Sequence, residues 1–291
     1  MRAKVDATIL RIVLIVLSVL VILSLWGFYS SIRPPKIISS LTPRELKMDY
    51  EDVSFRTADG LTLYGWYIPS EKETEKTVIL LHGYPADKGN ILPALAFLHE
   101  DFNLLLFDFR YLGKSEGSYS TAGAKEVQDL LAAIQFLKGR GIDKIGVWGF
   151  SMGGAVALMA IERAPELRAV ISESSYASLA EMAFELMKIP VLNYPIAYLV
   201  SFWAKLFLGI DLRDASPADR IRNTKIPILL IHSSADAVIP FSHARRLQQA
   251  LTNNPNAEFW FHEDFAHGQL ATDYRTRIKE FFLKHLGRDA S

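Results

Sequence analysis

The sequence predicts an α/β fold: a mostly parallel central sheet flanked by helices, with a helical cap and one N-terminal transmembrane helix. Three observations support this prediction. Short apolar runs typical of buried strands alternate with helix-like segments along most of the chain. A long connection between two of these runs is rich in large apolar residues. Near the amino terminus, an uncharged apolar run is long enough to cross a bilayer.

The first predicted element is a membrane-spanning helix over residues 12–28, extended by neighbouring apolar residues. As a helix this run measures about 26 Å. With the neighbouring apolar residues included, the helix measures about 31 Å, which matches the hydrocarbon core of a bilayer. Trp26, Phe28 and Tyr29 at its end are typical of an aromatic anchor at the membrane interface. A cleaved signal peptide is the main alternative, but these bulky residues stand where a small-residue cleavage site belongs. A buried helix of a soluble protein is the third alternative.

Positive charges near this helix bear on its orientation. Arg2, Lys4 and Arg11 precede the apolar run. They favour a cytoplasmic amino terminus, which places the rest of the chain on the extracytoplasmic side of a single-pass membrane protein. Arg33 and Lys36 follow the run and weaken this asymmetry.

The chain is predicted to divide into a membrane anchor over residues 1–32, a tether over 33–49 and an α/β domain over 50–291. Two prolines make the start of the tether stiff. The domain begins with an antiparallel hairpin over 53–57 and 61–68, joined by an Asp-Gly turn. Strands are then predicted near residues 77–82, 103–108, 144–149, 168–172, 226–232 and 257–262.

Residues 149–153 read Gly-Phe-Ser-Met-Gly and join an apolar strand to a helix of small residues. This is the pattern of a nucleophile elbow. The two glycines let strand and helix approach closely, while the hydroxyl of Ser151 stands clear at the start of the helix. The alternative is a turn rich in small residues that happens to contain a serine.

A serine nucleophile needs a base that is held by an acid. Asp236 follows the strand that ends near residue 232, and His267 follows the last predicted strand. Because the carboxyl ends of parallel strands share one edge of the sheet, Ser151, Asp236 and His267 are expected to converge there. Asp264 is a competing acid, but it lies only three residues from His267, which disfavours the required geometry.

The oxyanion formed by attack on a carbonyl needs hydrogen-bond donors already in place. One candidate is the backbone N–H of Met152, directly after the nucleophile. The other is the backbone N–H of Tyr84, in the loop after the strand near residues 77–82. The phenol of Tyr84 is also a candidate to contact the substrate.

Together, His82-Gly83, residues 149–153, Asp236 and His267 resemble the α/β-hydrolase superfamily of serine hydrolases. Residues 108–117 are similar to the D-x-R-G-x-G-x-S-x-G run of that family. The resemblance covers about residues 50–287, and its finer features look like those of membrane-anchored esterases, lipases and thioesterases. Two positions depart from the family pattern: Tyr111 and Ser233 stand where many relatives carry glycine.

The stretch over residues 176–219 is too long for an ordinary connection and is expected to form a helical cap over the serine edge. Pro190 and Pro195 are expected to break this cap into short pieces. Its apolar side chains either line an acyl pocket, dip into the bilayer or pack against the core. The residues expected to contact the substrate are Tyr84, Phe184, Met187, Phe202 and Trp203.

The composition excludes some classes of function. The 32 Lys and Arg residues balance the 32 Asp and Glu residues, so no nucleic-acid partner is expected. The absence of cysteine excludes disulfides and thiolate chemistry. The oligomeric state is not indicated.

The reaction expected from these residues is hydrolysis of a carboxylic ester or thioester, with a small lipophilic molecule or lipid as substrate. It proceeds through an acyl-enzyme on Ser151 and requires neither a metal nor an organic cofactor. The same residues would also serve a peptidase or amidase. A membrane-associated binding protein with vestigial catalysis is the remaining alternative.

Overall fold

The structure is a computed structural model that describes residues 2–186 and 193–287. Its centre is an eight-stranded sheet with the order β1-β2-β4-β3-β5-β6-β7-β8 in the described part of the chain. The pairs β1–β2 and β2–β4 are antiparallel, and all other neighbouring pairs are parallel. This confirms the predicted mostly parallel sheet.

Each predicted strand is present, with bounds that differ from the prediction by at most about two residues. The strands are β1 (Glu51–Arg56), β2 (Thr62–Ile68), β3 (Lys76–Leu81), β4 (Asn103–Phe107), β5 (Lys144–Phe150), β6 (Leu167–Glu173), β7 (Ile228–Ser233) and β8 (Ala257–His262). The central strands β3, β4 and β5 are buried along almost their whole length. Their continuous apolar sequences follow from helices covering both faces of the sheet.

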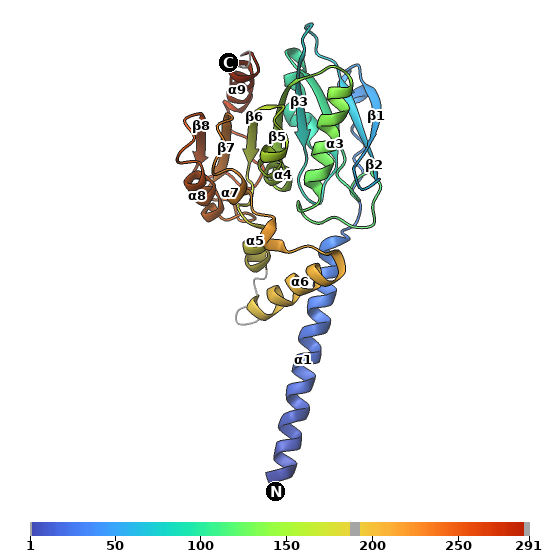
Figure 1. The fold of residues 1–291 in the computed structure, drawn as a ribbon, viewed down its shortest axis with the longest axis vertical. Helices are drawn as coiled ribbons and strands as arrows, with labels where there is room; N and C mark the ends of the chain where they lie inside the picture. Colours follow the sequence, from blue (N-terminus) through green and yellow to red (C-terminus); the bar gives the residue numbers. More distant parts are fainter. Residues whose placement is uncertain (1, 187–192, 288–291) are drawn as a thin grey trace.

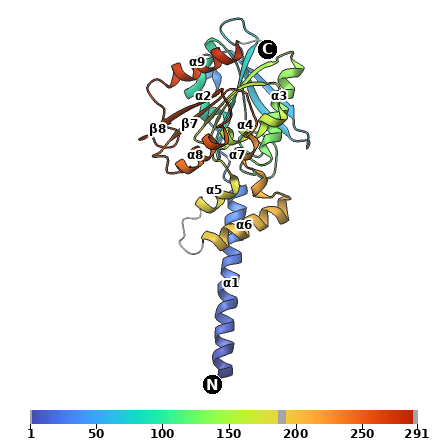
Figure 2. The same ribbon diagram turned by 60° about the vertical axis from the view of Figure 1, so that its left-hand side comes forward.

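Helices cover the two faces of the sheet (Figures 1 and 2). One apolar core joins the sheet to α3 (Glu126–Gly139), α4 (Met152–Ala160) and α8 (Phe241–Ala250). A second core joins the opposite face to α2 (Lys88–Leu95) and α9 (Tyr274–Leu286). Between these two layers, the strands from β4 to β8 run parallel, so their carboxyl ends lie at one edge of the sheet.

The connection from β6 to β7 contains α5 (Leu179–Leu186), α6 (Asn193–Leu208), the short turn η4 (Leu212–Asp214) and α7 (Pro217–Arg220). In both views α5 and α6 lie beneath the sheet, and α6 lies beside the end of α1 that reaches the α/β domain (Figures 1 and 2). Pro195 does not break the cap as predicted. It lies in the first turn of α6, where a missing backbone N–H costs no helical hydrogen bond. Pro190 lies outside the described residues.

The amino-terminal helix α1 (Arg2–Ile32) projects away from the α/β domain (Figure 1). Its segment Ala7–Ile32 has a mean hydropathy of 2.8 and is long and apolar enough to cross a membrane. Phe28, which the sequence suggested as part of an interfacial anchor, is instead buried against α6. Trp26 and Tyr29 do remain exposed, at 69% and 55%.

The segment predicted as a tether is bound to the α/β domain at several points. The Tyr111 hydroxyl donates to the Pro34 carbonyl at 2.9 Å, and the Ser39 N–H donates to the Asp87 carboxylate at 2.6 Å. Lys36 Nζ donates to the Ser115 carbonyl at 3.2 Å. These contacts fix the end of α1 relative to the α/β domain.

Candidate active site

Ser151 stands between β5 and α4 with φ 54° and ψ −115°. A positive φ is strained for a residue with a side chain, and such strain is found where a side chain must be aimed. The Ser151 N–H donates to the Glu173 carbonyl at 2.8 Å, which ties the turn to the neighbouring strand β6. The geometry is that of a nucleophile elbow.

Two glycines make this turn possible, as the sequence suggested. A Cβ at Gly149 would lie 2.3 Å from the Gly153 carbonyl oxygen. A Cβ at Gly153 would lie 2.6 Å from the carbonyl oxygen of Leu81 in β3. Helix α4 therefore approaches the sheet more closely than a residue with a side chain at either position would allow.

Asp236 and His267 are brought together by the loops after β7 and β8. His267 Nδ1 lies 2.7 Å from Asp236 Oδ2. Because a carboxylate only accepts hydrogen bonds, Nδ1 carries the proton and Nε2 is left as an acceptor. This is the tautomer that a general base in a serine hydrolase requires.

The Asp236 carboxylate is held in its ionised form. Burial opposes its charge, but the His267 ring and the N–H groups of Ile239 and Val238 outweigh this effect and lower the pKa of Asp236. The two backbone N–H groups donate to Oδ1 at 2.9 Å and 2.8 Å. The acid is therefore both oriented and charged.

The imidazole of His267 lies beside the elbow. Its ring packs against Phe150, the residue before Ser151, with 4.7 Å between the ring centroids. Among the described residues, no hydrogen bond joins Ser151 Oγ to His267. Such bonds are often long before substrate binds and tighten in the complex.

The predicted oxyanion donors lie around the same edge. Met152 opens α4, whose first backbone N–H groups have no acceptor within the helix. The loop that carries Tyr84 lies close to the elbow, because a Cβ at Gly83 would lie 3.3 Å from Ser151 Cβ. The Tyr84 phenol, however, donates to the Ser31 carbonyl of α1 at 2.7 Å. Burial raises the pKa of Tyr84 to about 12, so the phenol keeps its proton.

His82 holds the loop before Tyr84 in place. Its Nδ1 lies 2.7 Å from the Gly83 carbonyl, and its Nε2 accepts the Phe109 N–H at 3.1 Å. Both ring nitrogens are therefore used, and burial lowers the pKa of His82. Because both nitrogens are occupied by the backbone, His82 holds the loop and has no free nitrogen to accept a proton.

Both departures from the family pattern have a structural role. Tyr111 has a φ of 68°, a conformation that glycine adopts without strain, and its hydroxyl holds the segment after α1. Ser233 Oγ accepts the N–H of Ala235 at 3.2 Å and that of Phe265 at 3.0 Å. It therefore joins the loop that carries Asp236 to the loop that carries His267.

Glu173, at the end of β6, is a buried acid that the sequence analysis did not single out. Its Oε2 accepts the Tyr274 hydroxyl at 2.5 Å, while its carbonyl accepts the Ser151 N–H. Burial raises the pKa of Glu173 to about 7. An acidic residue ending an apolar strand was the signal available in the sequence.

The aromatic residues proposed to contact the substrate do not form one pocket. Phe184 and Phe202 line a groove of about 320 Å³ between α5 and α6 that does not include Ser151. Trp203 lies against α1, where its Nε1 donates to Ser24 Oγ at 3.0 Å. Met187 lies outside the described residues.

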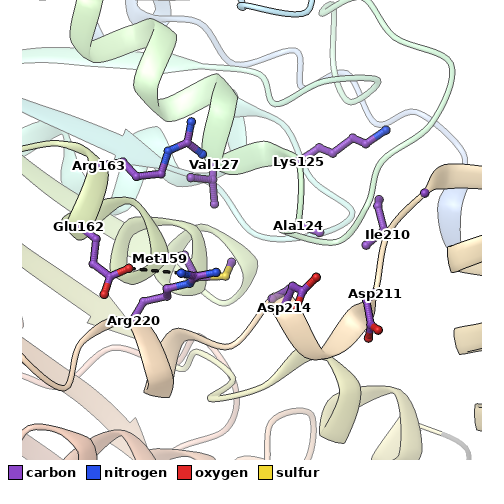
Figure 3. Close-up of a pocket in the computed structure, with 12 residues that line it drawn as sticks. Ala124, Lys125, Val127, Met159, Glu162, Arg163, Ile210, Asp211, Asp214 and Arg220 are labelled. Carbon is purple, nitrogen blue, oxygen red and sulfur yellow. Dashed lines mark hydrogen bonds and ion pairs between the residues drawn. The ribbon is translucent and has the colours of Figure 1, made fainter.

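A pocket of about 310 Å³ lies at the far end of α4 from Ser151 (Figure 3). Met159 and the Glu162–Arg220 ion pair line it, together with Lys125. Its lining includes charges of both signs and none of the predicted site residues. This pocket is therefore separate from the predicted site around Ser151.

Comparison with known proteins points to one family. The family described as alpha/beta hydrolase fold matches residues 76–197. YfhR of Escherichia coli K12, an uncharacterised protein, is 32% identical over 81% of this chain and 81% of its own length. The alpha/beta hydrolase domain-containing protein WAV2 of Arabidopsis thaliana is 30% identical over 75% of this chain and 72% of its own length.

A solved structure agrees with these sequence relatives. The esterase Pf2001 of Pyrococcus furiosus superposes with a TM-score of 0.74 and 30% identity. The match covers 88% of this chain and 99% of the esterase. The similarity therefore extends over almost the entire α/β domain.

Proposed function

Because the chain belongs to the α/β-hydrolase family, we propose that it is a serine esterase with Ser151 as nucleophile, His267 as base and Asp236 as the acid that orients it. The observation that carries this proposal is the hydrogen bond between His267 Nδ1 and Asp236, at the edge where the strained Ser151 opens α4. The similarity to an esterase of known structure supports an ester as the substrate.

In the proposed reaction, His267 Nε2 takes the proton of Ser151 Oγ as the oxygen attacks the ester carbonyl. The N–H groups of Met152 and Tyr84 stabilise the oxyanion. His267 then protonates the leaving alcohol, which leaves an acyl-enzyme on Ser151. Water activated by His267 attacks the acyl group and releases the acid.

We further propose that α1 is an uncleaved single-pass anchor with a cytoplasmic amino terminus and an extracytoplasmic α/β domain. Large apolar side chains along α1 are exposed in the described structure, and they need an apolar environment. Its last turns contact α6 through Phe28 and the Ser24–Trp203 bond. A helix removed as a signal peptide would expose this face of α6.

The proposal is tested with the purified full-length protein in detergent. We expect hydrolysis of 4-nitrophenyl acetate and butyrate, with kcat reduced by at least about 10³-fold in Ser151→Ala and in His267→Gln. Acyl 4-nitroanilides serve as matched amides, and preference for these substrates would favour the peptidase alternative. Ester hydrolysis that is unchanged in Ser151→Ala would contradict the proposal.

A further inference from the structure

An apolar cavity of about 120 Å³ lies where α1 meets the cap, and α1 itself forms one of its walls. Phe28, Ser31 and Ile32 contribute this wall. We propose that the cavity binds the acyl chain of the substrate, so that the membrane anchor is part of the substrate-binding site. This inference rests on the proposed esterase function.

The opposite walls come from the cap. Leu179 and Met182 of α5 line the cavity together with Val200 and Ala204 of α6. Almost all of the lining is apolar, so a bound alkyl chain would leave few polar groups without a partner. Engineered apolar cavities of about 150 Å³ stay dry and take up benzene, and a short stretch of alkyl chain has similar requirements.

Several contacts connect the cavity to the predicted reaction centre. Ser31 of its wall accepts the hydrogen bond from Tyr84, the residue proposed to supply an oxyanion donor. Ala122 of its wall accepts the Tyr176 hydroxyl at 2.7 Å. A Cβ at the next residue, Gly123, would lie 3.7 Å from Met152 Cγ. The cavity wall therefore contacts Tyr84 directly, and the residue that follows its Ala122 lies beside Met152.

The outer surface of the cap favours a membrane lipid as the source of this chain. Four side chains spaced four residues apart on α6 are 53–65% exposed, namely Tyr194, Tyr198, Phe202 and Leu206. Trp203 bonds α1 at Ser24, roughly 12 Å along the helix axis from Ile32. When α1 spans the bilayer, α6 therefore lies at the membrane interface, and the cavity between α1 and α6 lies close to the lipid acyl chains.

Cross-linking gives a direct test. The full-length protein is labelled on Ser151 with alkyl fluorophosphonates that carry a terminal diazirine, in a graded series of chain lengths, and then irradiated. We expect at least one chain length to cross-link to residues 28–32 or 200–208. Cross-links confined to other segments at every chain length would overturn the inference while leaving the esterase function in place. Absence of fluorophosphonate labelling on Ser151 would contradict both the inference about the cavity and the proposed esterase function.

Matched variants test the same inference through activity. Ala183→Leu narrows the cavity from α5. Its control is Ala180→Leu, which adds the same side chain to α5 in the separate groove lined by Phe184 and Phe202. On α1, Ile32→Phe narrows the cavity. Its control is Ile22→Phe, which makes the same change at a residue of α1 that is 63% exposed and does not line the cavity. All four are assayed on esters of acetate, octanoate and dodecanoate.

We expect Ala183→Leu and Ile32→Phe to lower kcat/KM for the long esters by about 10-fold or more, with acetate hydrolysis within twofold of the parent. The two controls are expected to match the parent on every ester. Equal losses on short and long esters in a folded, fluorophosphonate-reactive variant would overturn the inference. So would unchanged hydrolysis of long esters.

Discussion

The position of single protons decides what the side chains at the sheet edge can do. Asp236 accepts from His267 Nδ1, which leaves Nε2 to accept a proton. A second imidazole, which is buried, lies nearby: His232 Nε2 is 2.9 Å from the Ile239 carbonyl and therefore carries a proton of its own. Burial lowers the pKa of His232, so this ring stays neutral beside the acid.

The Asp236→Asn variant tests the assigned tautomer. The asparagine amide would donate to His267 Nδ1 and move the ring proton to Nε2, where it blocks proton transfer from Ser151. We expect kcat for ester hydrolysis to fall by about 10⁴-fold. Tm is measured as a control for folding, and a loss of less than 10-fold in a folded variant would show that another acid orients the histidine.

Glu173 predicts a pH dependence of stability. Its pKa is raised from 4.5 to about 7, so the unfolded chain loses this proton at a lower pH than the folded chain. The stabilisation is complete below pH 4.5 and is lost as pH rises to about 7, an effect of order a few kcal/mol. In Glu173→Gln we expect this loss to be absent from denaturant unfolding curves recorded from pH 4.5 to 8.

Parallel slopes of stability against pH for the parent and Glu173→Gln would contradict this assignment. The neutral amide can still accept the Tyr274 hydroxyl, so the comparison isolates the ionisation of Glu173.

Glu173 also shows which residues sequence patterns miss. Ser151 was predicted because its flanking glycines form a motif, whereas the roles of Glu173 and Ser233 depend on neighbours from distant segments.

Among the secondary-structure elements, strands were the easiest to predict. Burial on both faces leaves continuous apolar runs in β3 and β4, and these runs show where each strand begins and ends. The cap was predicted only in outline. Pro195 was predicted to break a helix, but a proline is tolerated in the first turn. The sequence pattern did not show that α6 begins at Asn193, two residues before this proline.

The contact between α1 and α6 was not predicted, because it pairs a segment near residue 24 with one near residue 203. The variant Trp203→Phe removes the donor to Ser24 and keeps most of the packing. Hydrogen bonds between membrane helices contribute about 0.6 kcal/mol on average. We therefore expect Tm in detergent to fall by roughly 2 °C. The control Phe202→Leu, at an exposed neighbour, is expected to change Tm less, and equal shifts would contradict a specific role for this bond.

The protein as a whole combines a long apolar helix, which we propose spans the membrane, with an α/β domain that is fixed to it. The segment after α1 is bound to the domain through Tyr111 and Asp87, and α6 contacts α1 directly. Composition predicted both parts. Their rigid connection depends on hydrogen bonds between residues far apart in the sequence, which no local pattern reveals.

The absence of cysteine allows a direct test of orientation. Single cysteines are introduced by Ala3→Cys at the amino terminus and Glu73→Cys on the exposed surface of the domain. In intact cells of a bacterial host, a membrane-impermeant maleimide is expected to label the Glu73→Cys variant and not the Ala3→Cys variant. The reverse pattern would place the domain in the cytoplasm.

The assignment of Ser151 as the nucleophile is tested most directly by mapping a fluorophosphonate adduct on the full-length protein by mass spectrometry. We expect a single adduct on Ser151, none in Ser151→Ala, and full labelling in Ser234→Ala, which removes an exposed serine from the loop of the acid. No adduct on the folded parent protein, or an adduct that persists in Ser151→Ala, would contradict the assignment.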